Sequence, residues 1–425
     1  MVVGVGWVFG SQLVALACGL VTGGILARGL GPEGQGLLAI ALLIPTFLAI
    51  SAGGGLNAAN VYFAGNGLIS TKLLVSNAIA VAAIATLLSA AAVALLWATG
   101  FLEDILPGMT LPIAVAGVLL LPLLLLRQSF SAVLLGLQRI SHVSLVDVLQ
   151  SLAYVLAALL LVALLRGGVP GAITAFGVAM TVALGFAALL LRRQGATLIP
   201  ATTIPTLRRT LGFGLRGSVG MVVQFFTYRL DLLLVNVMLG AAMTGYYAVA
   251  SRLAELLWLM PAAVGAVIFA RSSRGAALEM NRITPQAFWG TTIVGGLVAL
   301  AMAVAGPLAI STIYSEDFLP AYLPMAILLP GSVLLGASSV LANDLAGRGK
   351  PGLVSMSAFV AFALTVILDL ALIPPFGLVG AALASTIAYS TYCLGVAFMY
   401  LRVTGLSLLA FVGAIGSLAK VRDAR

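Results

Sequence analysis

Long apolar stretches separated by short polar segments run along nearly the whole chain. A helix needs roughly 20 apolar residues to cross the hydrocarbon core of a bilayer, and about twelve stretches of this kind can be placed on the sequence. The predicted spans cover residues 4–27, 37–64, 72–98, 111–136, 142–165, 169–191, 211–238, 241–269, 286–313, 321–346, 351–373 and 377–401. The pattern predicts an all-α integral membrane protein.

Charged residues support this partition and orient it. Most of the 21 Lys and Arg residues fall in loops after even-numbered spans and in the C-terminal tail. Loops after odd-numbered spans hold the acids Glu33, Glu103, Asp104, Glu316 and Asp317. Because Lys and Arg collect in short cytoplasmic loops, both termini are predicted to be cytoplasmic. The net charge of +9 then faces anionic lipid headgroups and indicates no nucleic-acid partner.

Composition agrees with a membrane location. The chain has 425 residues, of which 62% are hydrophobic and 8% charged, against about 25% charged in soluble domains. Such a chain has too little polar surface to face water on all sides. After the last span, Leu406–Leu418 is apolar but too short to cross, so we expect a helix at the membrane surface.

Two sequence motifs occur twice, and both pairs are 209 residues apart. Leu30–Gly36 and Leu239–Gly245 share the pattern L-G-x4-G, while Gly168–Ala175 and Gly377–Ala384 share G-x2-G-A-x2-A. Gly and Ala are common in this sequence, so the shared offset is the stronger observation. It predicts two parallel six-helix lobes with pseudo-two-fold symmetry, an arrangement typical of secondary transporters.

The longest connection between spans separates these two halves. It contains Pro200, Pro205 and four arginines, a composition typical of a linker. The predicted organisation is an N-terminal lobe at 1–191, a cytoplasmic basic linker at 192–210, a C-terminal lobe at 211–401 and a cytoplasmic or interfacial tail at 402–425.

Two motifs that suggest chemistry are better explained by structure. Gly29–Gly34 satisfies G-x-G-x-x-G, but it joins two membrane spans instead of a strand and a helix, so it predicts a turn and no dinucleotide site. His142 is the only histidine, and with the distant Cys18 and Cys393 it cannot build a zinc site. The sequence therefore predicts no catalytic residue, metal or cofactor.

Ionisable residues inside spans are the strongest functional signal, because a charge at the bilayer centre costs about 2.5–3.5 kcal/mol on insertion scales. Arg229 and Arg252 flank the turn at Gly240, and both lie about 17 Å from the outer edge of the membrane. Two guanidinium groups at one depth need carboxylates or a bound anion as compensation. The acids available as salt-bridge or ion-coupling groups are Asp231, Glu255 and Asp369.

Two hypotheses account for these charges. In the first, a salt-bridge network joins the seventh and eighth spans, and Arg252 and Glu255 can pair because they are spaced i,i+3 on one helix. In the second, Arg127, Arg229 and Arg252 line a water-filled vestibule and hold a phosphate group in bidentate fashion. The nearby acids limit the second hypothesis to a local positive patch.

Four segments carry a family resemblance: Ala27–Gly36, Asp231 followed by Leu239-Gly240, Gly245–Leu253, and Ile373–Ala384. In this order they resemble the polysaccharide transporter family of the multidrug, oligosaccharidyl-lipid and polysaccharide exporter superfamily, the O-antigen-type flippases. The resemblance spans nearly the whole chain. It implies a two-lobe helical fold that flips an undecaprenyl-diphosphate-linked oligosaccharide outward by alternating access.

The resemblance also implies a binding group for each part of such a substrate. Guanidinium groups suit a diphosphate, and polar and aromatic side chains suit a sugar. The residues predicted to contact the sugar are Asn57, Asn60, Tyr62, Gln224 and Tyr228. The expected partners are the lipid-linked oligosaccharide, membrane lipid and polysaccharide-assembly proteins, all at the cytoplasmic membrane.

Three other functions remain as alternatives. An ion-coupled multidrug or cation antiporter of the same superfamily would use Asp231 or Asp369 for coupling, although such relatives carry an acid in the first span and residues 4–27 contain none. A membrane glycosyltransferase or polymerase needs an acid, a base and metal ligands beside the membrane, and the short outward loops gather none. An assembly subunit without transport activity has no need for level arginines at mid-membrane.

Overall fold

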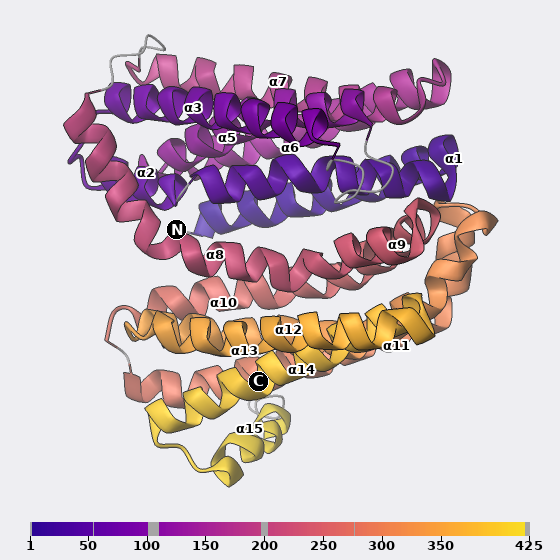
Figure 1. Cartoon of the computed structure of the whole chain (residues 1–425). Coiled ribbons are helices and arrows are strands. Elements are labelled where there is room, and N and C mark those ends of the chain that lie inside the picture. The colour runs from indigo at the N-terminus through magenta and orange to yellow at the C-terminus, as the bar shows by residue number, and fades with distance from the viewer. Residues whose placement is uncertain (1, 54, 101–109, 197–202, 276, 421–425) are drawn as a thin grey trace. The chain divides into compact units, whose positions relative to one another are not determined.

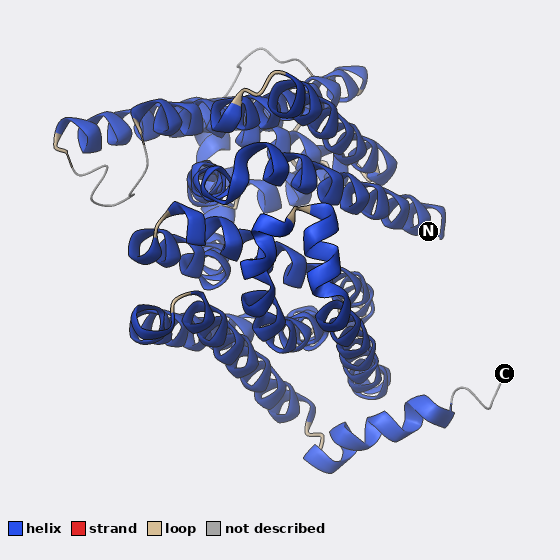
Figure 2. Ribbon diagram, turned by 90° about the vertical axis from the view of Figure 1, so that its right-hand side faces the viewer, coloured by secondary structure: helices blue, strands red, loops and turns tan. Residues whose placement is uncertain are grey.

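The computed structural model describes residues 2–53, 55–100, 110–196, 203–275 and 277–420 (Figure 1, Figure 2). Helices account for almost all of these residues, and no strand occurs within the described ranges. The all-α fold predicted from the sequence is confirmed. In chain order the α-helices are α1 (Val2–Gly53), α2 (Leu56–Gly65), α3 (Thr71–Ala98), α5 (Leu111–Gly136), α6 (Ile140–Ala158), α7 (Gly168–Arg193), α8 (Ile204–Leu239), α9 (Ala241–Ala254), α10 (Leu259–Ser272), α11 (Ala277–Ile313), α12 (Tyr322–Gly347), α13 (Pro351–Phe376), α14 (Leu378–Thr404) and α15 (Leu408–Lys420).

Within the described residues, 11 helices are long and apolar enough to cross a membrane. The first of them covers Gly10–Ser51, 42 residues, and a straight helix of that length would be about 63 Å long, twice the roughly 30 Å of a bilayer core. Its backbone leaves the helical conformation at Gly31, with φ 67° and ψ 179°. The break divides α1 into two arms. They contain the first predicted span and most of the second, whose last residues form the separate helix α2.

Contacts between α-carbons divide the chain into two compact units. Unit 1 comprises residues 1–222, 240–245 and 313–315, and unit 2 comprises 223–239, 246–312 and 316–425. In unit 1, α1 packs on α6, α3 on α5, and α6 on α7. In unit 2, α14 packs on both α12 and α13, and α10 packs on α12. Residues 197–202 of the predicted linker lie outside the described residues, and α8 begins inside that linker range.

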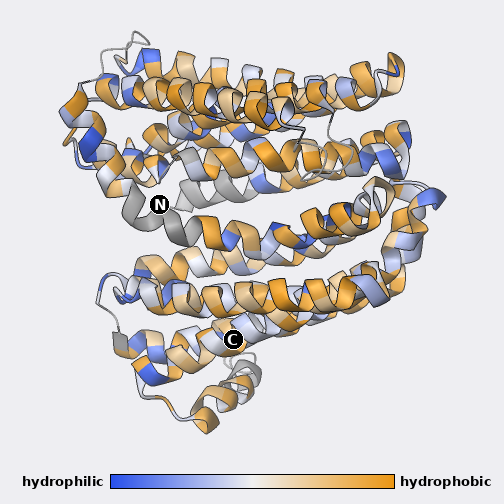
Figure 3. Ribbon diagram, viewed as in Figure 1, coloured by the Kyte–Doolittle hydropathy of each residue, from blue (hydrophilic) through white to orange (hydrophobic). Residues whose placement is uncertain are grey.

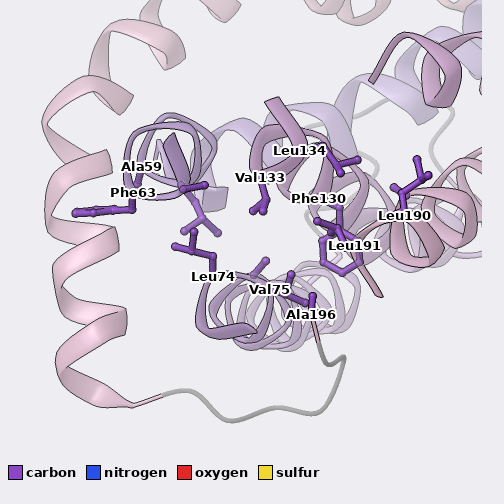
Figure 4. Packing of buried hydrophobic residues seen from close by; sticks show 14 of the residues in the cluster. Ala59, Phe63, Leu74, Val75, Phe130, Val133, Leu134, Leu190, Leu191 and Ala196 are labelled. Carbon is purple, nitrogen blue, oxygen red and sulfur yellow. The ribbon is translucent and has the colours of Figure 1, made fainter. Parts of the chain in front are cut away.

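Each unit has its own apolar core. In unit 1, residues from α2, α3, α5 and α7 interlock, among them Phe63, Leu74 and Val133 (Figure 4). In unit 2, the core contains several aromatic residues, among them Tyr389, Tyr392 and Tyr400. Apolar residues cover the length of the helices and hydrophilic ones gather towards their ends (Figure 3), as expected for helices whose sides meet lipid.

The duplicated motifs mark equivalent turns. Gly31 and Gly240 have φ values of 67° and 87°, and Gly168 and Gly377 have φ values of 56° and 57°. Side chains other than hydrogen are strained in this left-handed region, so each position needs glycine. The repeat seen in the sequence is therefore a repeat of backbone geometry at helix junctions.

A second glycine of the first motif permits a close approach of two backbones inside unit 1. A Cβ atom on Gly36 would overlap the carbonyl oxygen of Ala241, and a Cβ atom on Gly245 would overlap the carbonyl oxygen of Pro32. The contact is reciprocal between the two copies of the motif. The pattern L-G-x4-G thus specifies both a turn and a contact between the copies.

The tail after α14 forms the helix α15. Its Phe411 is 4% exposed and packs into the core of unit 2, and the indole nitrogen of Trp289 donates a hydrogen bond to the Phe411 carbonyl at 2.9 Å. At 13 residues, α15 is about 20 Å long, too short to cross the bilayer core. The predicted helix forms, and its position at the membrane surface stays a prediction.

Candidate functional site

Arg127 of unit 1 forms an ion pair across two helices. Its guanidinium, on α5, lies 2.8 Å from the Asp147 carboxylate on α6. The arginine side chain is 19% exposed and the aspartate side chain 45% exposed. Arg127 is therefore compensated by an acid that itself meets solvent or lipid, and the pair is only partly buried.

The polar residues predicted on α2 differ in their accessibility. The Asn57 amide donates to the Gln128 side chain and its oxygen accepts from the Ser129 hydroxyl, both at 3.2 Å. Asn60 is fully buried, and neither of its side-chain polar atoms has a hydrogen-bond partner. Burial removes Asn60 from any ligand-accessible surface in this conformation.

Tyr62 lies on an exposed aromatic surface of unit 1. The side chain is 45% exposed, and its ring stacks on Phe213 with centroids 4.8 Å apart. Next to this pair, the Arg209 guanidinium lies over the Phe63 ring at 5.3 Å. The arrangement offers a flat aromatic face beside a cation, at the start of α8.

Arg229 and Glu255 of unit 2 form a bidentate ion pair, with N–O distances of 2.7 and 3.1 Å. The expected i,i+3 pairing of Glu255 with Arg252 does not form. Glu255 begins a short 3₁₀ segment, Glu255–Trp258, directly after α9, and both of its carboxylate oxygens accept hydrogen bonds from the Arg229 guanidinium. An ion pair of the salt-bridge hypothesis is thus present, but it joins Glu255 to Arg229 and not to Arg252.

Arg252 is the arginine of this group that remains accessible. Its side chain is exposed on α9, and in the described part of the chain no ion pair joins it to a carboxylate. A charged group inside a membrane span faces a protein interior or a water-filled cavity in almost all membrane proteins, because lipid contact is costly. Arg252 is therefore the best placed of the three predicted arginines to meet an anion.

Two buried carboxyl groups lie in the core of unit 2. Asp231 is 3% exposed and accepts hydrogen bonds from the hydroxyls of Tyr247 at 2.6 Å and Ser385 at 2.9 Å. Asp369 is fully buried, neither of its oxygens has a hydrogen-bond partner, and it interacts electrostatically with Asp231. A buried carboxylate without compensation is strongly unfavourable, so this pair suits a proton or a small cation.

Gln224 and Tyr228 line a cavity of about 190 Å³ in unit 2. The Gln224 amide donates to the Tyr228 hydroxyl at 3.1 Å, and the Tyr228 ring packs against Trp258 with centroids 5.2 Å apart. The remaining walls come from helices far away in sequence. They are Leu335, Ser339, Ala342, Asn343, Val354 and Tyr392.

The sequence analysis missed a buried ion pair at one end of α12. Arg348 donates to both carboxylate oxygens of Asp344, at 2.9 and 3.0 Å, and Asp344 also accepts from the Ser272 hydroxyl. Asn281 of α11 accepts from the same guanidinium at 2.8 Å. The i,i+4 spacing of an acid and a base was visible in the sequence and could have revealed the pair. The cluster ties α10, α11 and α12 together.

Among the described residues, no group of three or more His, Cys, Asp or Glu side chains could hold a metal ion. Inside the predicted spans, the described residues offer the exposed guanidinium of Arg252, the buried carboxyl groups of Asp231 and Asp369, and an uncharged polar cavity. The guanidinium and the carboxyl groups can compensate a bound charge.

A family model described as polysaccharide biosynthesis protein matches residues 25–323, more than half of the chain. The chain is similar to an uncharacterised membrane protein of Methanocaldococcus jannaschii, at 25% identity over 188 residues, covering 43% of this chain and 37% of that protein. It is also similar to a probable low-salt glycan biosynthesis flippase of Haloferax volcanii, at 22% identity over 204 residues, covering 46% of this chain and 42% of that protein. The chain thus spans less than half the length of either curated relative.

Solved structures share the fold over most of their length. An inward-facing multidrug resistance MATE family transporter of the MOP superfamily has a TM-score of 0.74 at 16% identity, covering 92% of this chain and 98% of that chain. The lipid II flippase MurJ, in an inward closed conformation, has a TM-score of 0.74 at 16% identity, covering 97% of this chain and 90% of that chain. The predicted fold class is confirmed.

Proposed function

The chain belongs to the polysaccharide biosynthesis protein family, and on this premise we propose that it is a flippase that moves a polyprenyl-diphosphate-linked oligosaccharide across the cytoplasmic membrane by alternating access. The proposal adopts the substrate class that the resemblance seen in the sequence implies. It is supported by the similarity to a probable glycan biosynthesis flippase, and the many apolar helices agree with a multi-pass membrane protein.

The observation that carries the proposal is the exposed guanidinium of Arg252 on a membrane-spanning helix. A fixed guanidinium binds a diphosphate through two parallel hydrogen bonds, and a diphosphate is the charged part that a lipid-linked sugar cannot bring through lipid alone. Arg229, which already pairs with Glu255, would take a secondary part by sharing its hydrogens with the anion.

The proposal also includes an orientation of the protein in the membrane. Basic residues gather in the loops on one side of the spans, so both termini are proposed to be cytoplasmic and the substrate to enter from that side. Polysaccharide-assembly proteins that supply the lipid-linked sugar, or receive it on the other side, are the proposed partners.

Transport by the reconstituted protein tests the proposal. In liposomes, the wild-type chain should translocate a labelled polyprenyl-diphosphate oligosaccharide, and Arg252→Ala should abolish translocation while insertion and thermal unfolding stay normal. Arg252→Lys should retain a small part of the rate, because lysine keeps the charge and loses the fork geometry. Arg274→Ala removes an exposed arginine outside the spans and serves as the control. A normal rate for Arg252→Ala would remove Arg252 from the binding site.

We also propose that Asp231 and Asp369 couple transport to an ion gradient. Their burial, and the hydroxyls of Tyr247 and Ser385 around Asp231, form a set of oxygen atoms suited to Na⁺ or a proton. Asp369→Asn should make the transport rate independent of both gradients, without loss of substrate binding. A variant rate that still rises with an imposed sodium or proton gradient would exclude Asp369 from coupling.

The same carboxyl groups support the second candidate function, an ion-coupled multidrug or cation antiporter, as does the fold shared with a multidrug transporter. Such a protein would expel small organic cations against a sodium or proton gradient, with no lipid-linked sugar present. Gradient-driven cation efflux together with no movement of the lipid-linked sugar would reverse the order of the two candidates.

A further inference from the structure

We propose that the cavity of unit 2 lined by Gln224, Tyr228, Ser339, Asn343 and Tyr392 binds one uncharged sugar ring of the substrate; this inference rests on the proposed flippase function. We call it the amide–tyrosine pocket. It draws its walls from four helices, α8, α12, α13 and α14, so the sequence alone could not assemble it.

The chemistry of the walls selects the ligand class. No Asp, Glu, Lys or Arg lines the pocket, so it offers no charge compensation to a phosphate. It offers the amides of Gln224 and Asn343 and the phenol groups of two tyrosines. Amides and hydroxyls both donate and accept hydrogen bonds, as the hydroxyl groups of a sugar require.

Aromatic surface supplies the second half of sugar recognition. A pyranose ring presents hydroxyls at its edge and C–H groups on its faces, and the latter pack on apolar or aromatic surface. Tyr228 is held in place by Trp258 at 5.2 Å and by Tyr389 at 6.2 Å between ring centroids. A ring fixed in this way contributes contact area with little loss of conformational entropy on binding.

One wall group lacks a partner. The Ser339 hydroxyl oxygen is buried and has no hydrogen-bond partner, while the Asn343 amide nitrogen donates to the Ser339 carbonyl at 2.8 Å. A buried polar atom without a partner costs about 1–3 kcal/mol, but like Asn60 this oxygen lies away from the accessible surface. Hydrogen bonds to a ligand therefore fall to the exposed Gln224 and the half-buried Asn343 side chains.

Size limits the ligand to a single ring. The cavity of about 190 Å³ is smaller than the roughly 300–1,000 Å³ of clefts that hold drug-sized ligands. A multidrug substrate would therefore not fit, whereas one sugar of a longer oligosaccharide would.

Position in the chain also agrees with a sugar subsite. Asn343 lies four residues before the end of α12 at Gly347 and Val354 lies close to the start of α13 at Pro351, so the pocket is near the α12–α13 turn, which the charge pattern predicts to be cytoplasmic. Arg229 follows Tyr228 directly, and successive side chains on a helix point about 100° apart. The uncharged pocket and the Arg229–Glu255 pair therefore occupy neighbouring faces of α8.

Saturation-transfer NMR on the full-length protein tests the pocket, because it detects weak binding of small ligands. The probes are the methyl glycosides of glucose, galactose, mannose and N-acetylglucosamine, and the detergent carries no sugar headgroup. We expect transfer to the ring protons of at least one glycoside. Gln224→Leu should weaken that binding about three- to tenfold, the effect of losing one neutral hydrogen bond. No transfer to any of the four glycosides would overturn the proposal.

Two further variants make the result specific. Gln194→Leu makes the same change at an exposed glutamine of unit 1 and should bind like the wild type. Asn343→Leu should weaken binding as Gln224→Leu does; because Gln224 is exposed, its variant gives the answer if Asn343→Leu fails to fold. Unchanged binding in Gln224→Leu would also overturn the proposal.

The translocation assay separates this proposal from the one on which it rests. Glycoside binding that depends on Gln224, without movement of the lipid-linked sugar, would keep the pocket and refute the flippase function. Movement of the lipid-linked sugar at equal rates and equal apparent affinities in the wild type and Gln224→Leu would keep the flippase function and refute the pocket.

Discussion

The two halves of the chain share their turns and differ in their charges. Gly31 and Gly240, 209 residues apart, both have positive φ, whereas the residue 209 positions before Arg229 is Leu20 and the one before Asp231 is Thr22. The same holds for Glu255, which corresponds to Thr46. The repeat therefore preserves what shapes the helix junctions. Among the described residues, both bidentate ion pairs, Arg229–Glu255 and Arg348–Asp344, and the buried carboxyl groups lie in unit 2.

The comparison separates two kinds of constraint. A junction glycine is required by backbone geometry wherever the turn recurs. A buried charge is retained only where function or a partner compensates its cost. The differing polar groups of the units indicate that the structural repeat carries an asymmetric chemistry, in which unit 2 holds the ion-coupling candidates and the amide–tyrosine pocket.

The largest expected effect on stability comes from the glycines of the repeated motif, which the two halves share. Gly36→Ala and Gly245→Ala should each destabilise the protein by more than about 3 kcal/mol, above the usual 1–3 kcal/mol of overpacking, because the new methyl group meets a backbone carbonyl that cannot change rotamer. The midpoint of thermal unfolding in detergent measures the effect. Gly19→Ala places a methyl group in open space on the same helix α1 and is the matched control.

Combining the two changes sharpens this test. Since both glycines serve one reciprocal contact, the double variant should be much less destabilised than the two single variants added together. Additive effects would show that the two copies of the motif act independently. A Gly36→Ala midpoint equal to that of Gly19→Ala would show that the close approach is dispensable.

A smaller effect is expected from the ion pairs that distinguish the units. Glu255→Gln should cost about 1–2 kcal/mol, between the values for exposed and buried pairs, because Glu255 is 23% exposed and bonds Arg229 twice. Asp147→Asn should cost less than about 1 kcal/mol, since the Asp147 side chain is 45% exposed and makes one contact with Arg127. Equal unfolding midpoints for the two variants would contradict the comparison.

Much of the fold could be predicted from the sequence because its signals are local. Span length follows from apolar stretches, and the turn at Gly31 follows from a repeated motif. The pairing of Glu255 with Arg229 and not with Arg252 could not be predicted, since both arginines are within reach by sequence and tertiary packing decides between them. The burial of Asn60 could not be predicted either, because helix periodicity alone does not show which polar face packs against a neighbouring helix.

Of the candidate site, too, one part could be predicted from the sequence and another could not. Arg252 was found from its depth in a span, which is a property of sequence position. The amide–tyrosine pocket was found only in part: Gln224 and Tyr228 were predicted, but Asn343 and Tyr392 come from helices more than a hundred residues further along the chain. Side chains that meet only through tertiary packing leave no spacing pattern in one sequence.

The smallest expected effect on stability is at Thr22, the uncharged residue of unit 1 that corresponds to Asp231 in the repeat. Thr22, the counterpart of Asp231, is 2% exposed and its hydroxyl has no hydrogen-bond partner. Thr22→Val keeps the shape and removes a buried polar atom, so stability should be unchanged or rise by up to about 1 kcal/mol. Asp231→Val, by contrast, strands the hydroxyls of Tyr247 and Ser385 and should lower the unfolding midpoint and abolish gradient dependence. If transport by Thr22→Val also lost its dependence on the ion gradient, Thr22 and Asp231 would share a function. The two units would then differ in the residues they use and not in what those residues do.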